Sequence, residues 1–183
     1  MTASDYSCVE VAASGDPIVV RVISGVDSYA IQDGIRRLSE QSYFHRFLAS
    51  KRPFSTAELI QLANPDYVDH VALIATESSK AGTRTLGIGR FYLVQHAPIV
   101  VAELAVVVYD DCHRRGIATA LYKHLAQIAQ TLGVEEFCAI VHWSNQPMRS
   151  FLLKQGFLRV NEASQGNLQF ACRLSQSTPS PGF

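Results

Sequence analysis

The sequence predicts a mixed α/β domain, and three observations support this class. Segments rich in Val, Ile, Leu and aromatic residues, typical of strands, alternate at short intervals with segments of helical apolar spacing. Turn residues separate these segments, and no internal repeat is visible. The hydrophobic fraction of 48% and charged fraction of 17% are those of a folded globular chain. We therefore expect a mixed central sheet of about six to seven strands with helices on both faces.

The expected domain boundaries follow from local composition. Residues 1–15 and 175–183 are small or polar or contain proline, so we expect a flexible N-terminal tail and a disordered C-terminal tail. The 183-residue chain is large enough to bury a core, and nothing in it requires a second domain. We therefore place a single domain at residues 16–174.

The first expected elements are a strand and a helix. Residues 18–23 favour a strand because they are mostly Ile and Val. Asp27 can then cap a helix whose apolar side chains recur at helical spacing. These side chains are Tyr29, Ile31, Ile35 and Leu38.

A capping box and a strand meander come next. Ser55 can accept a helix-start amide while Glu58 reaches back to the cap, which predicts a helix to about residue 63. The strands of the meander are expected at residues 70–76, 86–94 and 99–109.

The longest expected helix has one apolar face and ends at Gly133. Its face comprises Ile117, Leu121, Leu125, Ile128 and Leu132. A strand at residues 137–141 follows, and Asn145 caps a short helix with Pro147 in its first turn. A final strand is expected at residues 167–173.

Charge and hydropathy argue against several function classes. Sixteen basic residues balance sixteen acidic ones, so total charge gives no reason to expect binding to nucleic acid or an anionic membrane. The longest nearly apolar stretch, residues 97–109, is shorter than a bilayer requires and contains Glu103. The N-terminus has no secretory pattern, so we expect a cytoplasmic protein.

The cysteines and histidines do not suggest a metal site. No C-x-x-C pair is present, and no histidine cluster has ligand spacing, so we expect reduced thiols and no metal. The cysteines are Cys8, Cys112, Cys138 and Cys172, and the histidines considered are His45, His70, His96 and His124.

The most informative segment, residues 106–118, joins an expected strand to the longest helix through a small basic loop. The first amides of a helix lack intrahelical acceptors and carry partial positive charge. Because Gly116 and Ala118 permit close approach, the loop is suited to bind a diphosphate. Arg114 and Arg115 would add charge-assisted contacts.

This loop resembles the acyl-CoA loop of the GNAT superfamily of N-acetyltransferases. That pattern is Gln or Arg, two variable residues, Gly, one variable residue, then Gly or Ala. Residues 113–118 fit it, except that His113 replaces the first residue. The resemblance implies that backbone groups of Val106 and Val108 pair with the pantetheine arm of acetyl-CoA, and that amides of residues 114–119 hold its pyrophosphate.

A second motif of the superfamily is matched by Asn145 and by residues 154–157, Lys-Gln-Gly-Phe. In the superfamily this asparagine commonly lies near the cosubstrate. The binding residues that the resemblance implies are Val106, Val107, Val108, His113, Arg114, Arg115, Gly116, Ile117, Ala118, Thr119 and Asn145.

Three further stretches resemble the bacterial protein lysine acetyltransferases of the Pat type. They are residues 42–47, 52–59 and 102–106, the last reading Ala-Glu-Leu-Ala-Val. In that branch the glutamate of the last stretch is the general base, which maps onto Glu103. The resemblance therefore implies acetyl transfer to a primary amine, with a protein lysine as the expected acceptor.

The chemistry of amine acetylation supports a base at Glu103. A lysine has a pKa near ~10.4, so at neutral pH its amine must lose a proton before it can attack. Strand alternation sets Glu103 on the face opposite Ala102 and Leu104 in an apolar run, where partial desolvation makes a carboxylate more basic. Two alternatives are that Glu103 faces solvent or pairs with a structural arginine.

Other residues leave their roles open. Leu152 stands where many relatives have the tyrosine that reprotonates the leaving thiolate, and packing is the expected role of Tyr109 and Tyr122, so no acid is assigned. We expect direct attack, with Cys112 not a nucleophile. Residues expected to line either the acceptor side or a hydrophobic loop are Tyr43, Phe44, Arg46 and Arg52. His142 and Trp143 could touch the cosubstrate or cap the core.

Two alternatives to a lysine acetyltransferase remain. One is an enzyme that acetylates a small-molecule amine, and the other is a non-catalytic acyl-CoA sensor. A monomer and a homodimer are both compatible with the sequence.

Overall fold

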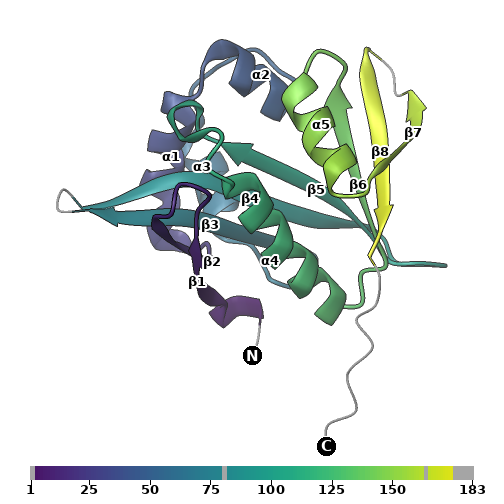
Figure 1. Cartoon of the computed structure of the whole chain (residues 1–183), viewed down its shortest axis with the longest axis horizontal. Helices are drawn as coiled ribbons and strands as arrows, with labels where there is room; N and C mark the ends of the chain where they lie inside the picture. Colours follow the sequence, from purple (N-terminus) through teal and green to yellow (C-terminus); the bar gives the residue numbers. More distant parts are fainter. Residues whose placement is uncertain (1–2, 80–81, 163–164, 175–183) are drawn as a thin grey trace, which may run out of the picture. The chain divides into compact units, whose positions relative to one another are not determined.

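The computed structural model describes residues 3–79, 82–162 and 165–174 (Figure 1). The helices are α1 Ser28–Arg37, α2 Glu40–Phe47, α3 Thr56–Ala63, α4 Ile117–Thr131 and α5 Gln146–Lys154. The strands are β1 Ser7–Val11, β2 Pro17–Val22, β3 His70–Ser79, β4 Gly82–Gln95, β5 Val101–Val108, β6 Glu136–His142, β7 Leu158–Glu162 and β8 Asn167–Arg173. Short 3-10 turns occur at Ala3–Asp5, Gly25–Asp27 and Asp110–Cys112.

The strands form an eight-stranded sheet in the order β1-β2-β3-β4-β5-β6-β8-β7. β5 and β6 pair in parallel, whereas β1–β2, β2–β3, β3–β4, β6–β8 and β7–β8 pair antiparallel. The predicted mixed α/β class is therefore confirmed. The expected strand number is corrected from six or seven to eight, because β1 and β7 were not predicted.

Both unpredicted strands lie at sheet edges and bury little apolar surface. The side chains of β1 are alternately exposed and half-buried, and in β7 Leu158 and Val160 are 71% and 49% exposed. An edge strand without a buried face gives weak hydrophobic periodicity, so its sequence resembles a tail or a loop. Residues 7–11 are thus a strand, which corrects the flexible tail expected at residues 1–15. The expected tail at 175–183 lies outside the described residues.

The chain forms two compact units. The first is Met1–Tyr92 with Leu104–Leu125, and the second is Leu93–Glu103 with Ala126–Phe183. The chain crosses between the units within β4, β5 and α4. That residues 16–174 form a single domain stays a prediction.

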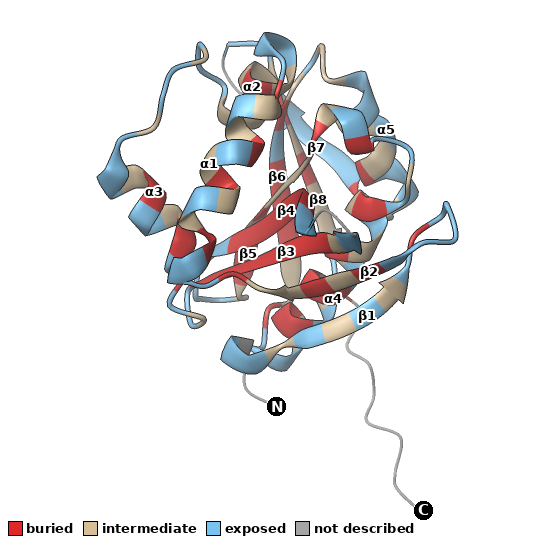
Figure 2. Ribbon diagram, turned by 90° about the vertical axis from the view of Figure 1, so that its left-hand side faces the viewer, coloured by how far each residue is buried: buried red, intermediate tan, exposed pale blue. Residues whose placement is uncertain are grey.

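In the first unit, the sheet is covered on both faces. A side chain at Gly89 would meet Leu121 and Leu125 of α4, at distances of 3.3 and 2.7 Å. The neighbouring Ile88 and Arg90 instead line a pocket with residues of α1 and α2. Because successive strand residues point to opposite faces, α4 lies on one face and α1 and α2 lie on the other. As a result, most of β3 and the middle of β4 are buried (Figure 2).

The second unit is built on a full ladder between β6 and β8. This ladder runs from Glu136↔Arg173 to His142↔Asn167, and β5 joins the other edge of β6. Phe137, Leu152 and Phe157 are almost fully buried in this unit. α5 begins as predicted, since the Asn145 side chain accepts a hydrogen bond from the Met148 amide at 3.2 Å.

The local helix signals had mixed success. The capping box of Ser55 and Glu58 is present at the start of α3. Asp27, however, makes no side-chain cap for α1, because its carboxylate accepts hydrogen bonds from Arg21 at 2.7 and 2.8 Å and from the Ser24 amide. The expected α1 cap is therefore wrong. α2 was not predicted at all.

Candidate active site

β5 carries two of the predicted binding residues on one edge. Its ladder with β6 runs from Val101↔Glu136 to Glu103↔Cys138 and has no further pair among the described residues. The Tyr109 amide donates to the Leu86 carbonyl of β4 at 3.0 Å. Since backbone groups alternate in direction along a strand, those of Val106 and Val108 point away from β4. These backbone groups therefore have the direction needed to form hydrogen bonds with an extended ligand beside the strand.

His113 engages one of these backbone groups. Its Nε2 atom lies 2.9 Å from the Val108 carbonyl oxygen, within hydrogen-bond distance. The residue that departs from the family pattern therefore ties the loop to the end of β5. The backbone of Val106 makes no comparable side-chain contact among the described residues.

The loop before α4 has the backbone shape of an anion site. Arg114 and Gly116 have φ angles of 62° and 78°, in the left-handed region. Ala120 donates to the Gly116 carbonyl at 3.0 Å, so the amides of residues 117–119 precede the first intrahelical bond and lack acceptors within α4. Alternating left- and right-handed residues turn successive amides toward one point, where an anion binds. A diphosphate fits these donors.

The two loop arginines differ in their surroundings. The Arg115 guanidinium pairs with Glu77 of β3 at 2.5 Å and lies 3.5 Å from Asp16, and these contacts raise its pKa. Arg114 is exposed, and no ion pair holds it among the described residues. Arg114 is thus the available cation. The Arg115 side chain would have to leave its ion pairs with Glu77 and Asp16 before it could contact a phosphate as expected.

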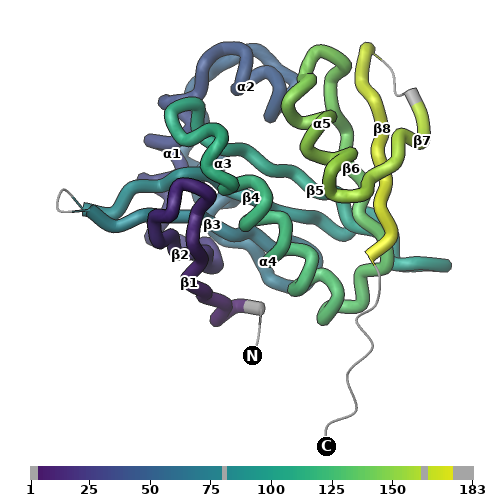
Figure 3. The backbone as a smooth tube through the Cα atoms, in the orientation of Figure 1, coloured from purple at the N-terminus to yellow at the C-terminus, as the bar shows by residue number. Residues whose placement is uncertain are grey.

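The turn between β1 and β2 contacts the loop that precedes α4; Figure 3 shows the course of the backbone there. The Ala13 amide donates to the Arg115 carbonyl at 2.9 Å. A side chain at Gly116 would lie 3.3 Å from the Ala13 Cβ. The sequence did not reveal this support, because β1 gives little periodic signal and its residues were assigned to a tail.

Glu103 is half-buried on β5 between the buried Ala102 and Leu104. It forms no ion pair or hydrogen bond within the described residues. No arginine of the described residues pairs with it, whereas the alternative that it faces solvent stays open. Its charge contributes, after burial, to raising the pKa of Cys138, its register partner on β6, to about 11.

Other predicted roles are partly decided. The Asn145 side chain caps α5, so its contact with acetyl-CoA stays a prediction. Leu152 is fully buried and Tyr109 is 1% exposed, consistent with packing for both. Cys112 is fully buried, and burial together with Asp111 raises the pKa of its thiol, which makes it a poor nucleophile. Trp143 is 60% exposed, so it does not cap the core.

Of the four residues considered for the acceptor side, Tyr43, Phe44 and Arg46 lie on helix α2 rather than in a loop, and Arg52 lies before α3. Tyr43 of α2 is 2% exposed and packs against Phe47 and Phe54, with ring centroids 4.6 and 6.2 Å apart. Arg46 lines a pocket beside β4, and Arg52 lines a second pocket of about 320 Å³ while pairing with Glu58. Tyr43 is thus structural, whereas both arginines lie at pockets.

The structure brings together three groups that sequence spacing did not connect. The ligand atoms of Cys8, Glu10 and His124 lie within 4.8 Å of one another. Glu10 already pairs with Lys123 at 2.7 Å and lies 3.1 Å from His124, so its carboxylate is the centre of a polar cluster. The absence of a metal stays a prediction. None of the helices in the described ranges is long and apolar enough to span a bilayer.

Comparison with known proteins decides the family. A sequence model described as "Acetyltransferase (GNAT) family" matches residues 33–157, more than half of the chain. The chain belongs to the GNAT acetyltransferase family. This acetyltransferase is therefore an N-acyltransferase that uses acetyl-CoA as cosubstrate and an amine as acceptor. Two features fit that cosubstrate: the amides at the start of α4 that lack acceptors within the helix, and the edge of β5 that has no strand partner after Glu103 among the described residues.

The acetyltransferase resembles Pat proteins among known sequences and structures. It is 27% identical over 150 residues to an acetyltransferase of Pseudomonas aeruginosa, covering 82% of this chain and 80% of the relative. It is 29% identical over 149 residues to the acetyltransferase Pat of Mycolicibacterium smegmatis, covering 81% of this chain but 44% of that protein. The GNAT domain of S. lividans PAT superposes with a TM-score of 0.84 at 25% identity, covering 92% of this chain and 97% of that domain.

Proposed function

We propose that this acetyltransferase transfers an acetyl group from acetyl-CoA to the side-chain amine of a protein lysine, with Glu103 as general base. The observation that carries the base assignment is a half-buried carboxylate without a partner among the described residues, on the strand that also bears Val106. The similarity to Pat proteins supports the lysine acceptor.

Each proposed role follows from a local feature. Acetyl-CoA supplies the acetyl group as a thioester. Glu103 accepts the proton of the ammonium, directly or through a water molecule, and the freed nitrogen lone pair attacks. The amide of Val106, directed away from β4, is a donor for the negative charge that develops on the carbonyl oxygen. The carbon–sulfur bond breaks, and the electron pair leaves with the CoA thiolate.

The proposed binding roles divide between backbone and side chain. The amides of residues 114–119 hold the pyrophosphate, and Arg114 adds a charge-assisted contact. Val106, Val107 and Val108 form the strand beside the pantetheine arm. His113 positions the Val108 carbonyl, and Asn145 lies at the start of α5, where its cap leaves the amide nitrogen for a ligand.

The test compares Glu103→Gln with wild type, using labelled acetyl-CoA and either a cell lysate or a panel of small amines. We expect labelled protein bands in the lysate and a fall in kcat of about 10²- to 10⁴-fold in the variant, with CoA affinity unchanged. Glu136→Gln is the matched control, since Glu136 is a half-buried carboxylate on the adjacent β6.

The possible results separate the alternatives. Labelled small products without labelled proteins would establish a small-molecule acceptor. Binding of CoA without turnover on any amine would indicate an acyl-CoA sensor. Equal loss in the Glu103 and Glu136 variants would remove Glu103 from the role of base.

A further inference from the structure

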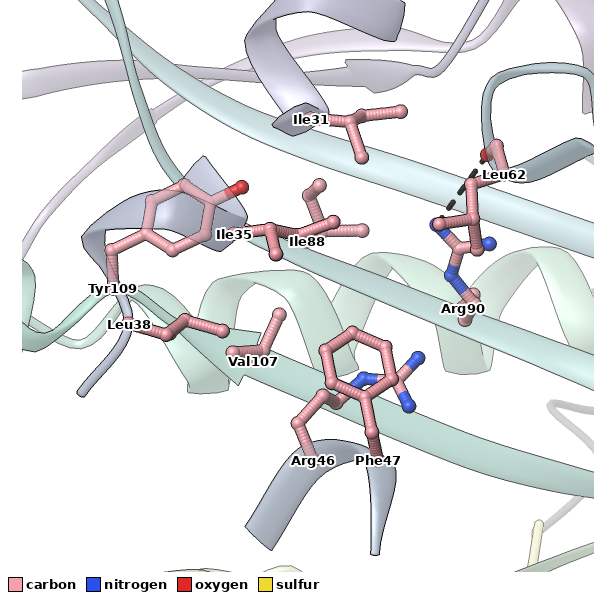
Figure 4. Close-up of a pocket in the computed structure, with 10 residues that line it drawn as sticks. All are labelled: Ile31, Ile35, Leu38, Arg46, Phe47, Leu62, Ile88, Arg90, Val107 and Tyr109. Atoms are coloured by element: carbon pink, nitrogen blue, oxygen red, sulfur yellow. Dashed lines mark hydrogen bonds between the residues drawn. The ribbon is translucent and has the colours of Figure 1, made fainter. Parts of the chain in front are cut away.

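A small pocket in the first unit lies between the helices α1 and α2 and the strands β4 and β5 (Figure 4). Its volume is about 20 Å³, enough for one water molecule. The apolar part of its lining includes Ile31, Ile35, Leu38, Ile88 and Val107. Arg90, Tyr109 and Arg46 are its polar side chains.

Arg90 is buried, and no described residue acts as its counterion. Only 2% of it is exposed, and no ion pair forms with a carboxylate of the described residues. Its Nη atoms lie 3.4 Å from Tyr92 and His70 and 3.5 Å from the Leu62 carbonyl, at the long limit of hydrogen bonds. The Nε atom has no partner among the described residues.

The neighbours of Arg90 do not neutralise its charge. Burial, followed by the charge of Arg90, lowers the pKa of His70 to about 4, so this ring is neutral at pH 7. Two half-buried arginines of the same unit differ from Arg90, since Arg21 pairs with Asp27 and Arg37 with Asp111, each at 2.7 Å. Arg90 is more deeply buried than either and has no such carboxylate among the described residues.

A second polar group in the same pocket also lacks a partner. Tyr109 is 1% exposed, and its hydroxyl makes no hydrogen bond within the described part of the chain. The ring is fixed in place, because a Cβ at Gly34 of α1 would lie 1.9 Å from its Cζ and hydroxyl atoms. Arg37 stacks over the ring, 4.8 Å from its centroid.

These two observations point to an anionic ligand. A buried cation without compensation and a buried hydroxyl without a partner both destabilise the fold, and such groups persist where a ligand completes them. The Nε and one Nη atom of arginine form a planar fork that matches a carboxylate. On Arg90 this edge is bound only by the weak contact to Leu62.

We propose that this pocket binds a carboxylate of the amine acceptor, with Arg90 as its counterion. The inference rests on the proposed function, since Val107 lines the pocket and lies between the valines assigned to pantetheine. Because the pocket has room for about one water molecule, entry of a carboxylate requires that the half-buried Arg46 or Phe47 turn aside.

The carboxylate is either the α-carboxylate of a free amino acid or an acidic side chain beside the target lysine. Two pairs of acceptors distinguish these sources. L-Lysine and L-lysinamide differ only in the α-carboxylate. Two peptides with Asp or Asn beside the target lysine differ only in a side-chain charge. For the pair that matches the true source, we expect wild-type kcat/KM to favour the carboxylate by about 10- to 100-fold.

The variants test whether Arg90 is the cause. Arg90→Met should abolish the preference while maintaining or raising the melting temperature, because an uncompensated buried charge is removed. Arg90→Lys keeps the charge but loses the fork, so it should retain only part of the preference. Arg84→Met is the control, as Arg84 lies on the same strand and is exposed. It should retain the full preference.

A measurement without turnover separates this proposal from the proposed function. The Nε–H signal of Arg90, assigned by its loss in Arg90→Lys, should shift with propionate and not with propionamide. If no amine is acetylated, the lysine function fails and this titration alone decides the pocket. Absence of a shift, or equal use of both members of each acceptor pair, overturns the proposal. So does a lower melting temperature of Arg90→Met with unchanged preference.

Discussion

Single charged residues within apolar strands carry most of the functional information in this chain. Glu103 and Arg90 both interrupt runs of apolar residues, on β5 and β4. A charge in such a position costs free energy, so it is retained for a partner or for chemistry. The sequence analysis proposed Glu103 on this signal, and the same signal is present at Arg90.

His70 makes the stability of the protein depend on pH. Its pKa falls from 6.5 to about 4 in the folded state, so between these values the unfolded chain binds more protons. The free energy of unfolding should therefore decrease as pH falls from 6.5 to 4, by up to about 3 kcal/mol. Urea titrations across this range measure the slope.

Two variants check this pH dependence. His70→Gln should flatten the slope between pH 6.5 and 4, whereas His96→Gln should leave it unchanged because His96 is exposed. Arg90→Met should reduce it, since the Arg90 charge is the second cause of the shift. An unchanged slope in His70→Gln would assign the effect to other groups.

At the scale of elements, α4 begins and ends at glycines with similar backbone angles. Gly116 and Gly133 have φ angles of 78° and 80°, which cost other residues about 1–2 kcal/mol. Gly116 belongs to the loop that we assign to the pyrophosphate, whereas a Cβ at Gly133 would meet nothing within 4 Å.

The two glycines form a matched pair for a test. Gly116→Ala and Gly133→Ala should each lower the free energy of unfolding by about 1 kcal/mol. Only Gly116→Ala should also weaken CoA binding, about 10-fold or more, because it displaces the amides that face the diphosphate. Calorimetry with CoA and urea titration measure the two effects. Equal CoA affinity of both variants would contradict the loop assignment.

At the scale of the whole molecule, the net charge of zero means that CoA affinity depends on local donors rather than on a general positive field. A ligand that binds only the folded state stabilises it by about 2.7 kcal/mol at a hundredfold excess over Kd. For a chain of this size, acetyl-CoA should raise the melting temperature by about 5–10 °C.

Pantetheine is the control ligand for this measurement. It lacks the diphosphate, so it should produce a much smaller shift at the same concentration. A melting temperature that does not respond to millimolar acetyl-CoA would contradict binding at this site.

The sequence by itself determined the mixed α/β class, the position of α4, the bounds of β8 and the loop at residues 113–118. These features depend on local periodicity, caps and a short motif, which are written in consecutive residues. It also indicated Glu103, because a carboxylate in an apolar run is visible without coordinates. The edge strands and α2 were missed because their apolar residues give little periodic signal.

Only the tertiary structure decided which residues become partners across the chain. Arg115 finds Glu77, Ala13 supports Gly116, and Tyr109 packs on Gly34. It also revealed that Arg90 has no counterion among the described residues. The physical reason is that burial and pairing depend on groups distant in sequence. The residue pattern of one strand does not specify which side chains pack against it.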